Sequence, residues 1–405
     1  MAEPVLATHS QRPTRQRNEL AALRALHLFG PLSRAELARR LGLNRSSSGH
    51  IIAALTLEGL VRARDGSEQP LPGQAPSRHS HAGRPGIMIE LVPGAVYFIG
   101  IEIGVEHISV IEIDLGSSIV STTVEAFDGA AAGVAATVGH AVQMVTAVIP
   151  ATRLARCEGV GIAVPAQMDK HGFVRLAPLL RWENVHLAER VREALPISVP
   201  VVAENDGNAF AIGASYGGSE PHGGVTLYLV LESGVGGGII ANGSLFRGAN
   251  GLAGEIGHLK ISGAAEPSRT LEEVLGLDHI LTEYGRVSAV LAPTFEHFLA
   301  DVRDRVPGAV SIAEEWARAL AFGLIQACRV IDADRIVLGG SVAALYPLMA
   351  ARVAHHIQST QEPSFPLPTI EMNSQQAAGP AYGAACILHQ RYLTTDSQRL
   401  ADEGG

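Results

Sequence analysis

Two polar side chains follow an apolar run in the middle of the chain, and their types suit the binding of hydroxyl groups. The run ends at Ala203, and Asn205 and Asp206 come within three positions of it. In an α/β sheet, ligands bind beyond the carboxyl ends of the strands. Asn205 offers both a donor and an acceptor, whereas an ionised Asp206 offers acceptors only. The pair therefore predicts a site that suits the hydroxyls of a polyol.

A second group of candidate residues lies further along the chain. Residues 226–231 form an apolar run typical of a buried strand, and it opens into a glycine-rich stretch at 233–238. Glycines let backbone amides approach a ligand or another strand closely. Asn242-Gly243, between apolar segments, predicts a hairpin. Glu255 and His258 are three positions apart, so a helical segment would place them on one side.

The order of these motifs resembles that of the ROK family (repressor, open reading frame, kinase). The motifs are the triplet END that closes at Asp206, the turn GVGGG, the segment RGANGLAGEIGH that closes at His258, and the stretch from Gly159 to Leu187. The resemblance covers roughly residues 96–388. It implies a sugar kinase or a sugar-responsive repressor on an actin-like, ribonuclease H-like fold of two lobes.

The resemblance also implies which residues contact the sugar. The family's sugar-contacting positions match Asn205, Asp206, Glu255 and His258, and Glu272 is a weaker match. The alternative is that these polar residues only cap helices and close turns.

The phosphate-binding turns depart from the family pattern. In kinases of the family, an Asp matching Asp206 acts as general base, and a first phosphate turn resembling Asp-x-Gly-Gly-Thr follows the first strand. This chain instead has Val105 and Glu106 in that turn, and Glu232 and Ser233 where a Gly-Thr pair is usual. Added carboxylates repel a polyanion. We therefore expect a lost nucleotide site and no enzyme activity, with a sugar kinase carrying an appended DNA-binding head as the alternative.

The family's structural zinc is also not expected here. Relatives follow the segment that closes at His258 with a cysteine-rich loop, whereas residues 259–271 of this chain contain no cysteine. A tetrahedral structural site needs four ligands, typically thiolates and imidazoles. We predict no metal and no cofactor.

The N-terminal part carries the opposite charge to the rest of the chain. Residues 1–92 contain twelve Arg, no Lys and seven Asp or Glu, which gives them a net charge of +5. Because the whole chain has a net charge of −9, the remaining residues carry a net charge of −14. A basic head on an acidic body indicates that only the head faces nucleic acid. A solvated Arg-rich surface is the alternative from charge alone.

The pattern of residues 1–92 predicts a winged helix-turn-helix. A helical run over 18–29 is followed by a capping box of Ser33 and Glu36, which starts a second helix, and Asn44 caps a third. The start of that third helix enters the major groove in such modules. A three-helix protein-interaction module is the alternative.

The wing of this module is expected to consist of strands at 60–61 and 87–91, with 65–85 as a mobile loop. The Gly83-Arg84-Pro85 tripeptide resembles a minor-groove hook, or it merely turns the chain into the wing strand. The expected DNA-binding residues are Arg45, Ser46, Ser47, Ser48, His50 and Arg84.

Beyond residue 92, alternating strands and helices predict an α/β body. The first lobe is expected over 93–206 with a returning helix at 379–392, the second lobe over 207–378, and a disordered tail over 393–405. Residues 129–152 are uncharged, yet their valines recur at helical spacing, so a buried helix is favoured over a membrane span.

Together these features predict a cytoplasmic, sugar-responsive transcriptional regulator; a repressor is favoured, and an activator is the alternative. Its expected partners are operator DNA, a small sugar or sugar phosphate as effector, and further copies of itself in a homodimer or homotetramer, with no membrane. The three cysteines are far apart and predict no disulfide framework. A third possibility is a vestigial sugar site, with a protein partner supplying the signal.

Overall fold

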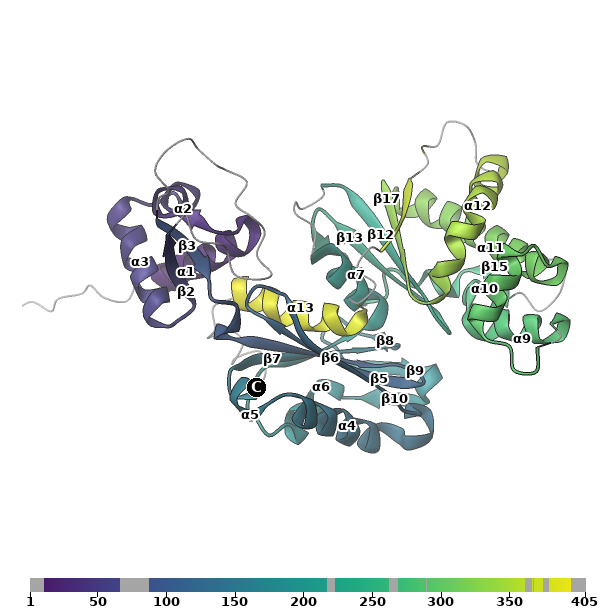
Figure 1. Ribbon diagram of the computed structural model, residues 1–405, viewed down its shortest axis with the longest axis horizontal. Helices are drawn as coiled ribbons and strands as arrows, with labels where there is room; N and C mark the ends of the chain where they lie inside the picture. Colours follow the sequence, from purple (N-terminus) through teal and green to yellow (C-terminus); the bar gives the residue numbers. More distant parts are fainter. Residues whose placement is uncertain are drawn as a thin grey trace, which may run out of the picture.

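The structure is a computed structural model that describes residues 11–65, 87–216, 223–261, 269–288, 290–360, 366, 368–373 and 379–394. The predicted DNA contact Arg84, the predicted wing loop after Asp65 and the predicted tail after Thr394 lie outside these residues. Within them, the chain forms an N-terminal head and two α/β lobes, with one C-terminal helix, α13, at the centre (Figure 1).

Three helices and a small sheet form the head. The elements are α1 (Gln11–Phe29), β1 (Leu32–Ser33), α2 (Arg34–Leu41), α3 (Arg45–Leu57), β2 (Val61–Asp65) and β3 (Ile87–Leu91), with strand order β1-β3-β2. Both predicted caps are present, because the Ser33 hydroxyl accepts the Glu36 N–H at 3.1 Å and the Asn44 side chain accepts the Ser47 N–H at 2.8 Å. Gly42 turns the chain between α2 and α3 with a φ of 65°, which favours glycine. The predicted helix-turn-helix is confirmed.

The first lobe is built on a five-stranded sheet of order β11-β7-β4-β5-β6. Strands β4, β7 and β11 run parallel, and β4, β5 and β6 form an antiparallel meander. Helix α4 covers one face of this sheet (Figure 1). The elements are η1 (Pro93–Ala95), β4 (Tyr97–Ile103), β5 (His107–Asp114), β6 (Ile119–Ala126), α4 (Gly129–Val148), α5 (Ala151–Leu154), β7 (Cys157–Val164), β8 (Gln167–Met168), β9 (Val174–Ala177), η2 (Pro178–Leu180), β10 (Trp182–Val185), α6 (Leu187–Ala194) and β11 (Val201–Asn205).

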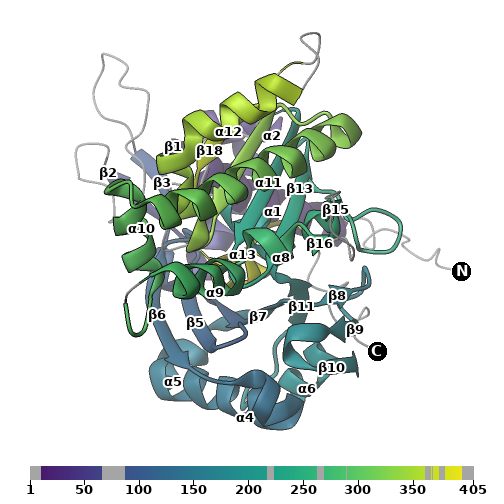
Figure 2. The same cartoon turned by 90° about the vertical axis from the view of Figure 1, so that its right-hand side faces the viewer.

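The second lobe repeats the layered plan with a sheet of order β14-β13-β12-β17-β18. Helices α9 to α12 cover one face of it (Figure 2), and Phe210 of α7 packs on the other. The elements are α7 (Asp206–Tyr216), β12 (Val225–Leu231), β13 (Val235–Ala241), β14 (Ser244–Leu245), η3 (Ile256–His258), β15 (Lys260–Ile261), β16 (Arg269–Thr270), α8 (Glu272–Leu275), α9 (Leu277–Val287), α10 (Phe295–Arg303), α11 (Pro307–Ile331), β17 (Arg335–Gly339), η4 (Val342–Leu345), α12 (Tyr346–Thr360) and β18 (Thr369–Met372).

Helix α13 (Pro380–Thr394) packs on strands β4 and β7 and against α7. Glycines make these approaches possible. A Cβ at Gly100 would lie 1.8 Å from the Ala381 carbonyl oxygen, and one at Gly161 would lie 2.0 Å from that of Ala384. A Cβ at Gly383 would lie 1.7 Å from the Ala209 carbonyl oxygen of α7. The predicted return of the last helix to the first lobe is confirmed, and the same helix also touches the second lobe.

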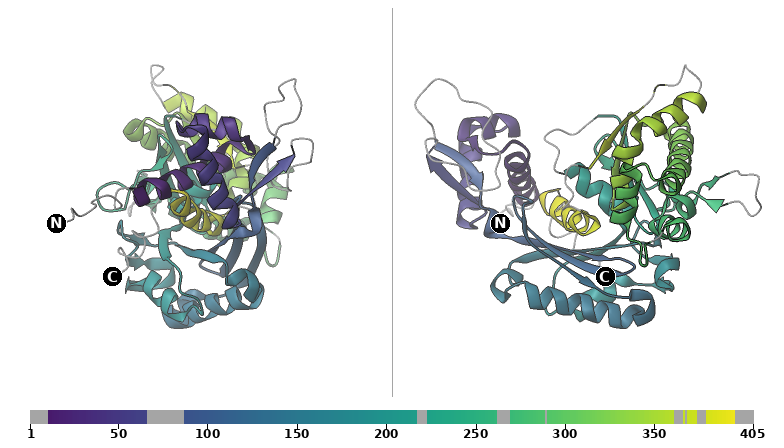
Figure 3. Two further views of the ribbon diagram at one scale, coloured as in Figure 1. Left: turned by 90° about the vertical axis from the view of Figure 1, so that its left-hand side faces the viewer. Right: turned by 45° about the vertical axis from the view of Figure 1, so that its right-hand side comes forward.

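The head shares its hydrophobic core with the body. One cluster of buried side chains contains Leu26 of α1 and Ile52 of α3 together with Phe98 of β4 and Leu388 of α13. Both views of Figure 3 show α1, in purple, beside α13, in yellow. The head therefore sits on the body as a packed unit.

Some element boundaries differ from those expected. The apolar run was expected to end at Ala203, but strand β11 continues through Glu204 and Asn205. The glycine-rich stretch was expected to form a turn, but Gly236 lies within strand β13. The predicted tail starts too early, since Leu393 is a buried residue of α13.

Among the described residues, one helix, α4, has the length and apolar composition of a membrane span. In the structure its residues Val138, Val142 and Val145 pack on the first-lobe sheet. It is thus a core helix, as the valine spacing predicts.

Candidate functional site

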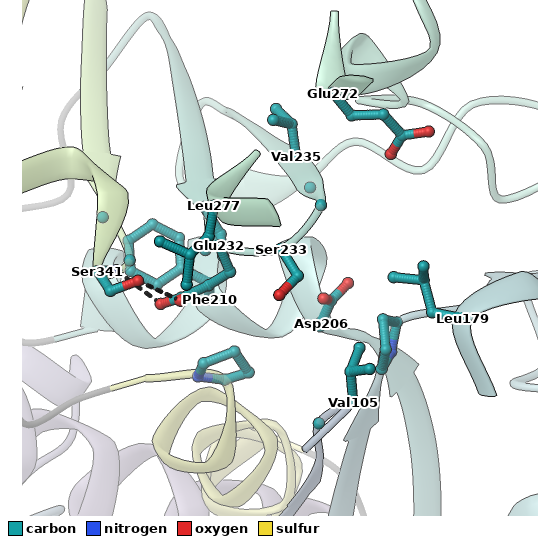
Figure 4. A pocket seen from close by; sticks show the side chains of 18 of the residues that line it. Val105, Leu179, Asp206, Phe210, Glu232, Ser233, Val235, Glu272, Leu277 and Ser341 are labelled. Atoms are coloured by element: carbon teal, nitrogen blue, oxygen red, sulfur yellow. Dashed lines mark hydrogen bonds between the residues drawn. The ribbon is translucent and has the colours of Figure 1, made fainter. Parts of the chain in front are cut away.

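A cavity of about 910 Å³ lies between the two lobes (Figure 4). All five predicted sugar-binding residues line it: Asn205, Asp206, Glu255, His258 and Glu272. The structure thus brings together residues from β11, α7, η3 and α8. Their role as sugar ligands stays a prediction.

Asn205 ends β11 and Asp206 begins α7, so both side chains are held by the junction of a strand and a helix. The Asn205 amide donates to the Ala166 carbonyl at 3.1 Å and accepts the Asn208 N–H at 3.0 Å. Asp206 accepts the Gly207 N–H at 2.8 Å. Asn205 therefore caps a helix, as the alternative interpretation holds, but an amide retains further donor and acceptor capacity for a ligand.

The pKa of Asp206 is raised to about 7, chiefly by burial, with the negative charges of Glu102 and Glu255 adding to the shift. Near neutral pH, its carboxyl can therefore either accept a hydrogen bond from a hydroxyl or donate one to it. Figure 4 shows its carboxyl group among the side chains that line the cavity.

Glu255, His258 and Glu272 form the second polar wall of the cavity. His258 Nδ1 lies 3.3 Å from Glu255 Oε2, and His258 Nε2 lies 3.9 Å from Glu272 Oε1. Burial raises the pKa of Glu255, while the neighbouring His258 opposes that shift. An imidazole between two carboxylates presents donors and acceptors close together, which is how hydroxyl groups are bound.

Sequence reasoning missed Glu204 as a residue that supports this site from behind the cavity wall. Its side chain is buried, accepts the Asn208 amide at 3.0 Å and forms an ion pair with Arg247. Arg247 starts the segment that carries Glu255, so the pair fixes that segment against β11. A carboxylate directly after an apolar run is the signal that could have pointed to it.

Acidic side chains also line the cavity: Glu232 lies beside η4 of the second lobe, and Glu102 lies on β4 of the first lobe. Glu232 accepts the Ser341 N–H at 2.7 Å and the Ser341 hydroxyl at 2.6 Å (Figure 4). Glu102 accepts the Ser109 hydroxyl at 3.0 Å and lies 3.6 Å from His107 Nε2. The amide of Ser341 thus already binds an anion, the Glu232 carboxylate.

The zinc site of the family does not fit the residues present. His258 faces Glu255 and Glu272, and the free cysteines Cys157, Cys328 and Cys386 belong to other elements. Within the described ranges, which exclude 262–268, no three His, Cys, Asp or Glu side chains are arranged so that they could hold a metal ion. The donor set at His258 lacks the thiolates that a structural zinc requires.

The candidate DNA-binding surface is the start of α3. Arg45, Ser46 and His50 are exposed there, and Ser47 is half-buried. Ser48 was expected to contact DNA, and this is wrong: the side chain is 2% exposed on the inner face of α3, beside the core residues Ile51 and Ile52. A helical period of 3.6 residues turns this one serine of the run inward.

Comparisons with known proteins agree with this architecture. The chain is 26% identical over 394 residues to a xylose repressor of Bacillus spizizenii, with 93% of this chain and 96% of that protein covered. It is 27% identical over 222 residues to a glucokinase of Halalkalibacterium halodurans, with 50% of this chain and 66% of that protein covered. The relatives of this chain thus include both a transcriptional repressor and a sugar kinase.

Solved structures share the fold. A crystal structure of a ROK family transcriptional regulator, described as a homologue of the E. coli MLC protein, superposes with a TM-score of 0.73 at 18% identity and covers 96% of this chain and 98% of that one. A ROK family glucokinase from Streptomyces griseus, with glucose and AMPPNP, superposes with a TM-score of 0.63 at 24% identity, covering 73% of this chain and 99% of that one. The α/β fold with an N-terminal helix-turn-helix and a two-lobe actin-like body is confirmed. The ROK profile matches residues 98–391, and the chain belongs to the ROK family.

Proposed function

We propose that this protein is a sugar-responsive transcriptional repressor of the cytoplasm. Its head binds operator DNA as a dimer through the start of α3, and its interlobe cavity binds the sugar effector. The sugar changes DNA affinity if it prefers one arrangement of the lobes and head. Similarity to a xylose repressor over nearly the whole chain supports this function.

One observation carries the proposal. The cavity retains Asn205, Asp206 and His258 for a sugar, whereas Glu232 blocks the Ser341 amide beside it. A nucleotide phosphate would have to displace this carboxylate and approach Glu102 as well, against charge repulsion. The same negative side chains favour a neutral sugar over a sugar phosphate.

Fluorescence anisotropy with the DNA upstream of the protein's own coding region tests the proposal. D-Xylose is the first sugar to add, because of the similarity to xylose repressors, and D-glucose and N-acetylglucosamine follow. We expect sequence-selective binding that one of these sugars weakens. Weak binding to any DNA, governed by salt alone, would contradict the proposal.

Two substitutions should separate the two activities. Arg45→Ala should weaken operator binding on the order of 5- to 150-fold, the loss of one bidentate base contact, without changing sugar affinity. Arg303→Ala, which removes an equal charge from the exposed surface of α10, is its control and should change little. Asp206→Asn should weaken sugar binding about 10- to 100-fold and leave operator binding intact. Loss of both activities in both variants would contradict separate sites.

A second candidate function is a sugar kinase with a DNA-binding head. The raised pKa of Asp206, about 7, favours it, since a general base works best when its pKa is near the operating pH. Production of ADP from ATP and a hexose, abolished in Asp206→Asn, would establish this activity. The carboxylates of Glu102 and Glu232 lead us to expect none.

A further inference from the structure

Three polar rings meet where α7, α13 and α1 come together. Tyr216 is the last residue of α7, His389 lies on α13, and His27 lies on α1. The His27 ring centroid is 4.8 Å from that of His389 and 5.5 Å from that of Tyr216. The rings thus connect the helix that starts in the cavity with the helix that starts the head.

The hydrogen bonds of His389 have a defined direction. Its Nε2 lies 2.8 Å from the Leu115 carbonyl, which can only accept, so Nε2 carries the proton. Burial lowers the pKa of His389 to about 3, so the ring is neutral and its Nδ1 is an acceptor. The Tyr216 hydroxyl, 2.5 Å away, therefore donates to Nδ1. His389 is 0% exposed, so water does not replace either partner.

The ring of His389 is also fixed to the first lobe. It packs edge-on against Phe98 of β4, with ring centroids 5.1 Å apart. Burial lowers the pKa of His27 to about 4, so the ring that α1 contributes is neutral too. In this cluster the two histidine rings are neutral and pack together. The hydrogen bond from the Tyr216 hydroxyl to His389 joins α7 to α13 there.

Helix α7 is suited to carry a displacement from the cavity to this cluster. It begins at Asp206, and its residues from Gly207 to Gly213 are all buried. Where it crosses α13, a Cβ at Gly213 would lie 3.0 Å from the Gly383 Cα, so the two backbones are in contact. The Tyr382 ring also lies at this crossing, 3.1 Å from that Cβ position, so a shift at Asp206 displaces close-packed neighbours and is not absorbed by an empty space.

We infer that the cluster of Tyr216, His389 and His27 couples the interlobe cavity to the DNA-binding head, with Tyr216 as the positioning residue. A sugar that moves Asp206 alters the Tyr216–His389 contact at the other end of α7, and His27 passes the change to α1. The inference rests on the proposed function, because it requires a sugar that changes DNA affinity.

Tyr216→Phe tests this inference, since it removes the hydroxyl and keeps the ring. Operator affinity is measured with and without D-xylose, D-glucose or N-acetylglucosamine, and the ratio is the coupling factor. We expect sugar-free operator affinity and DNA-free sugar affinity to stay within about twofold, while the coupling factor falls about 2- to 13-fold, the value of one hydrogen bond. Coupling is reciprocal, so DNA must change sugar affinity by the same reduced factor.

Tyr284→Phe is the matched control. It removes a hydroxyl that donates to Asp301 at 2.6 Å within the second lobe, and should leave the coupling factor unchanged. His27→Ala, which removes the ring that α1 contributes to the cluster, is the second variant and should also lower the coupling factor. It keeps the inference testable if Tyr216→Phe does not fold.

The outcomes separate the inference from the function on which it rests. An unchanged coupling factor in Tyr216→Phe or in His27→Ala, or an equal fall in Tyr284→Phe, overturns the inference and leaves the repressor function standing. A wild-type protein whose operator affinity no sugar changes overturns both.

Discussion

At the scale of single residues, Asp206 combines a ligand-binding position with a shifted pKa. In the folded protein its pKa is about 7, against an ordinary value of 3.8. Between these two values the folded state binds more protons than the unfolded state, so the free energy of unfolding falls as pH rises through this window. Ionisation of Asp206 therefore makes the folded protein less stable as the pH rises from about 4 to about 7.

This predicts a difference between wild type and Asp206→Asn. The variant has no carboxyl to ionise, so its free energy of unfolding should fall less than that of wild type between pH 5 and pH 8. Chemical denaturation at the two pH values measures this. Asp278→Asn, an exposed aspartate of the same cavity, should behave as wild type. Equal pH dependence in wild type and Asp206→Asn would show that the pKa of Asp206 is not raised.

Residue types predicted the polar wall of the cavity well, because Asn205, Asp206 and His258 stand in a specific order of motifs. The contact of Glu232 with Ser341 could not be predicted, since it joins residues that are far apart in sequence and that only the sheet brings together. Ser48 failed for a different reason: its spacing of three and four residues to Ile51 and Ile52 points it inward, but the prediction followed the polar residue type and not this spacing.

At the scale of elements, the crossing of α7 and α13 depends on glycine. Gly383→Ala should destabilise the protein by about 1–3 kcal/mol or more, because the added methyl would lie 1.7 Å from the Ala209 carbonyl oxygen. Gly139→Ala on the exposed face of α4, where no atom lies within 4 Å of the added Cβ, should instead stabilise by about 0.5–1 kcal/mol through helix propensity. Chemical denaturation compares the two. Equal effects would mean that the backbones are not in contact.

Elements with strong local signals were predictable, including the valine-rich helix α4, the capped helices of the head and the hairpin at Asn242-Gly243. The hairpin of β9 and β10 was not, because each strand has only four residues and charged side chains interrupt both. The glycines of β13 were expected in a turn, yet pairing with β12 holds them in a strand. Tertiary pairing here overrides local preference.

At the scale of the whole molecule, the head and the first lobe share one hydrophobic cluster. Leu388→Ala should therefore speed amide hydrogen exchange in α3, although Leu388 lies on α13, because truncating a buried leucine costs about 2–5 kcal/mol of the cluster's stability. Leu320→Ala, equally buried in the second-lobe cluster, is the control and should leave α3 exchange unchanged. Unchanged exchange in Leu388→Ala would show that the head unfolds independently.

The sequence predicted a head and a body as separate modules, because charge and helix patterns differ sharply at about residue 92. It could not predict their shared core. The apolar residues of α1 read as one helix face, and nothing local shows that part of this face packs on α13.

The place of α13 in the chain has a consequence for synthesis on the ribosome. The head is translated first, but the helix on which it packs is translated last among the described elements. At roughly 5–20 residues per second, the interval between α1 and α13 is on the order of 20–70 s. During that time the nascent head lacks the part of its hydrophobic core that α13 contributes. A prematurely terminated chain that lacks α13 would thus leave exposed the apolar side chains of the head that α13 covers.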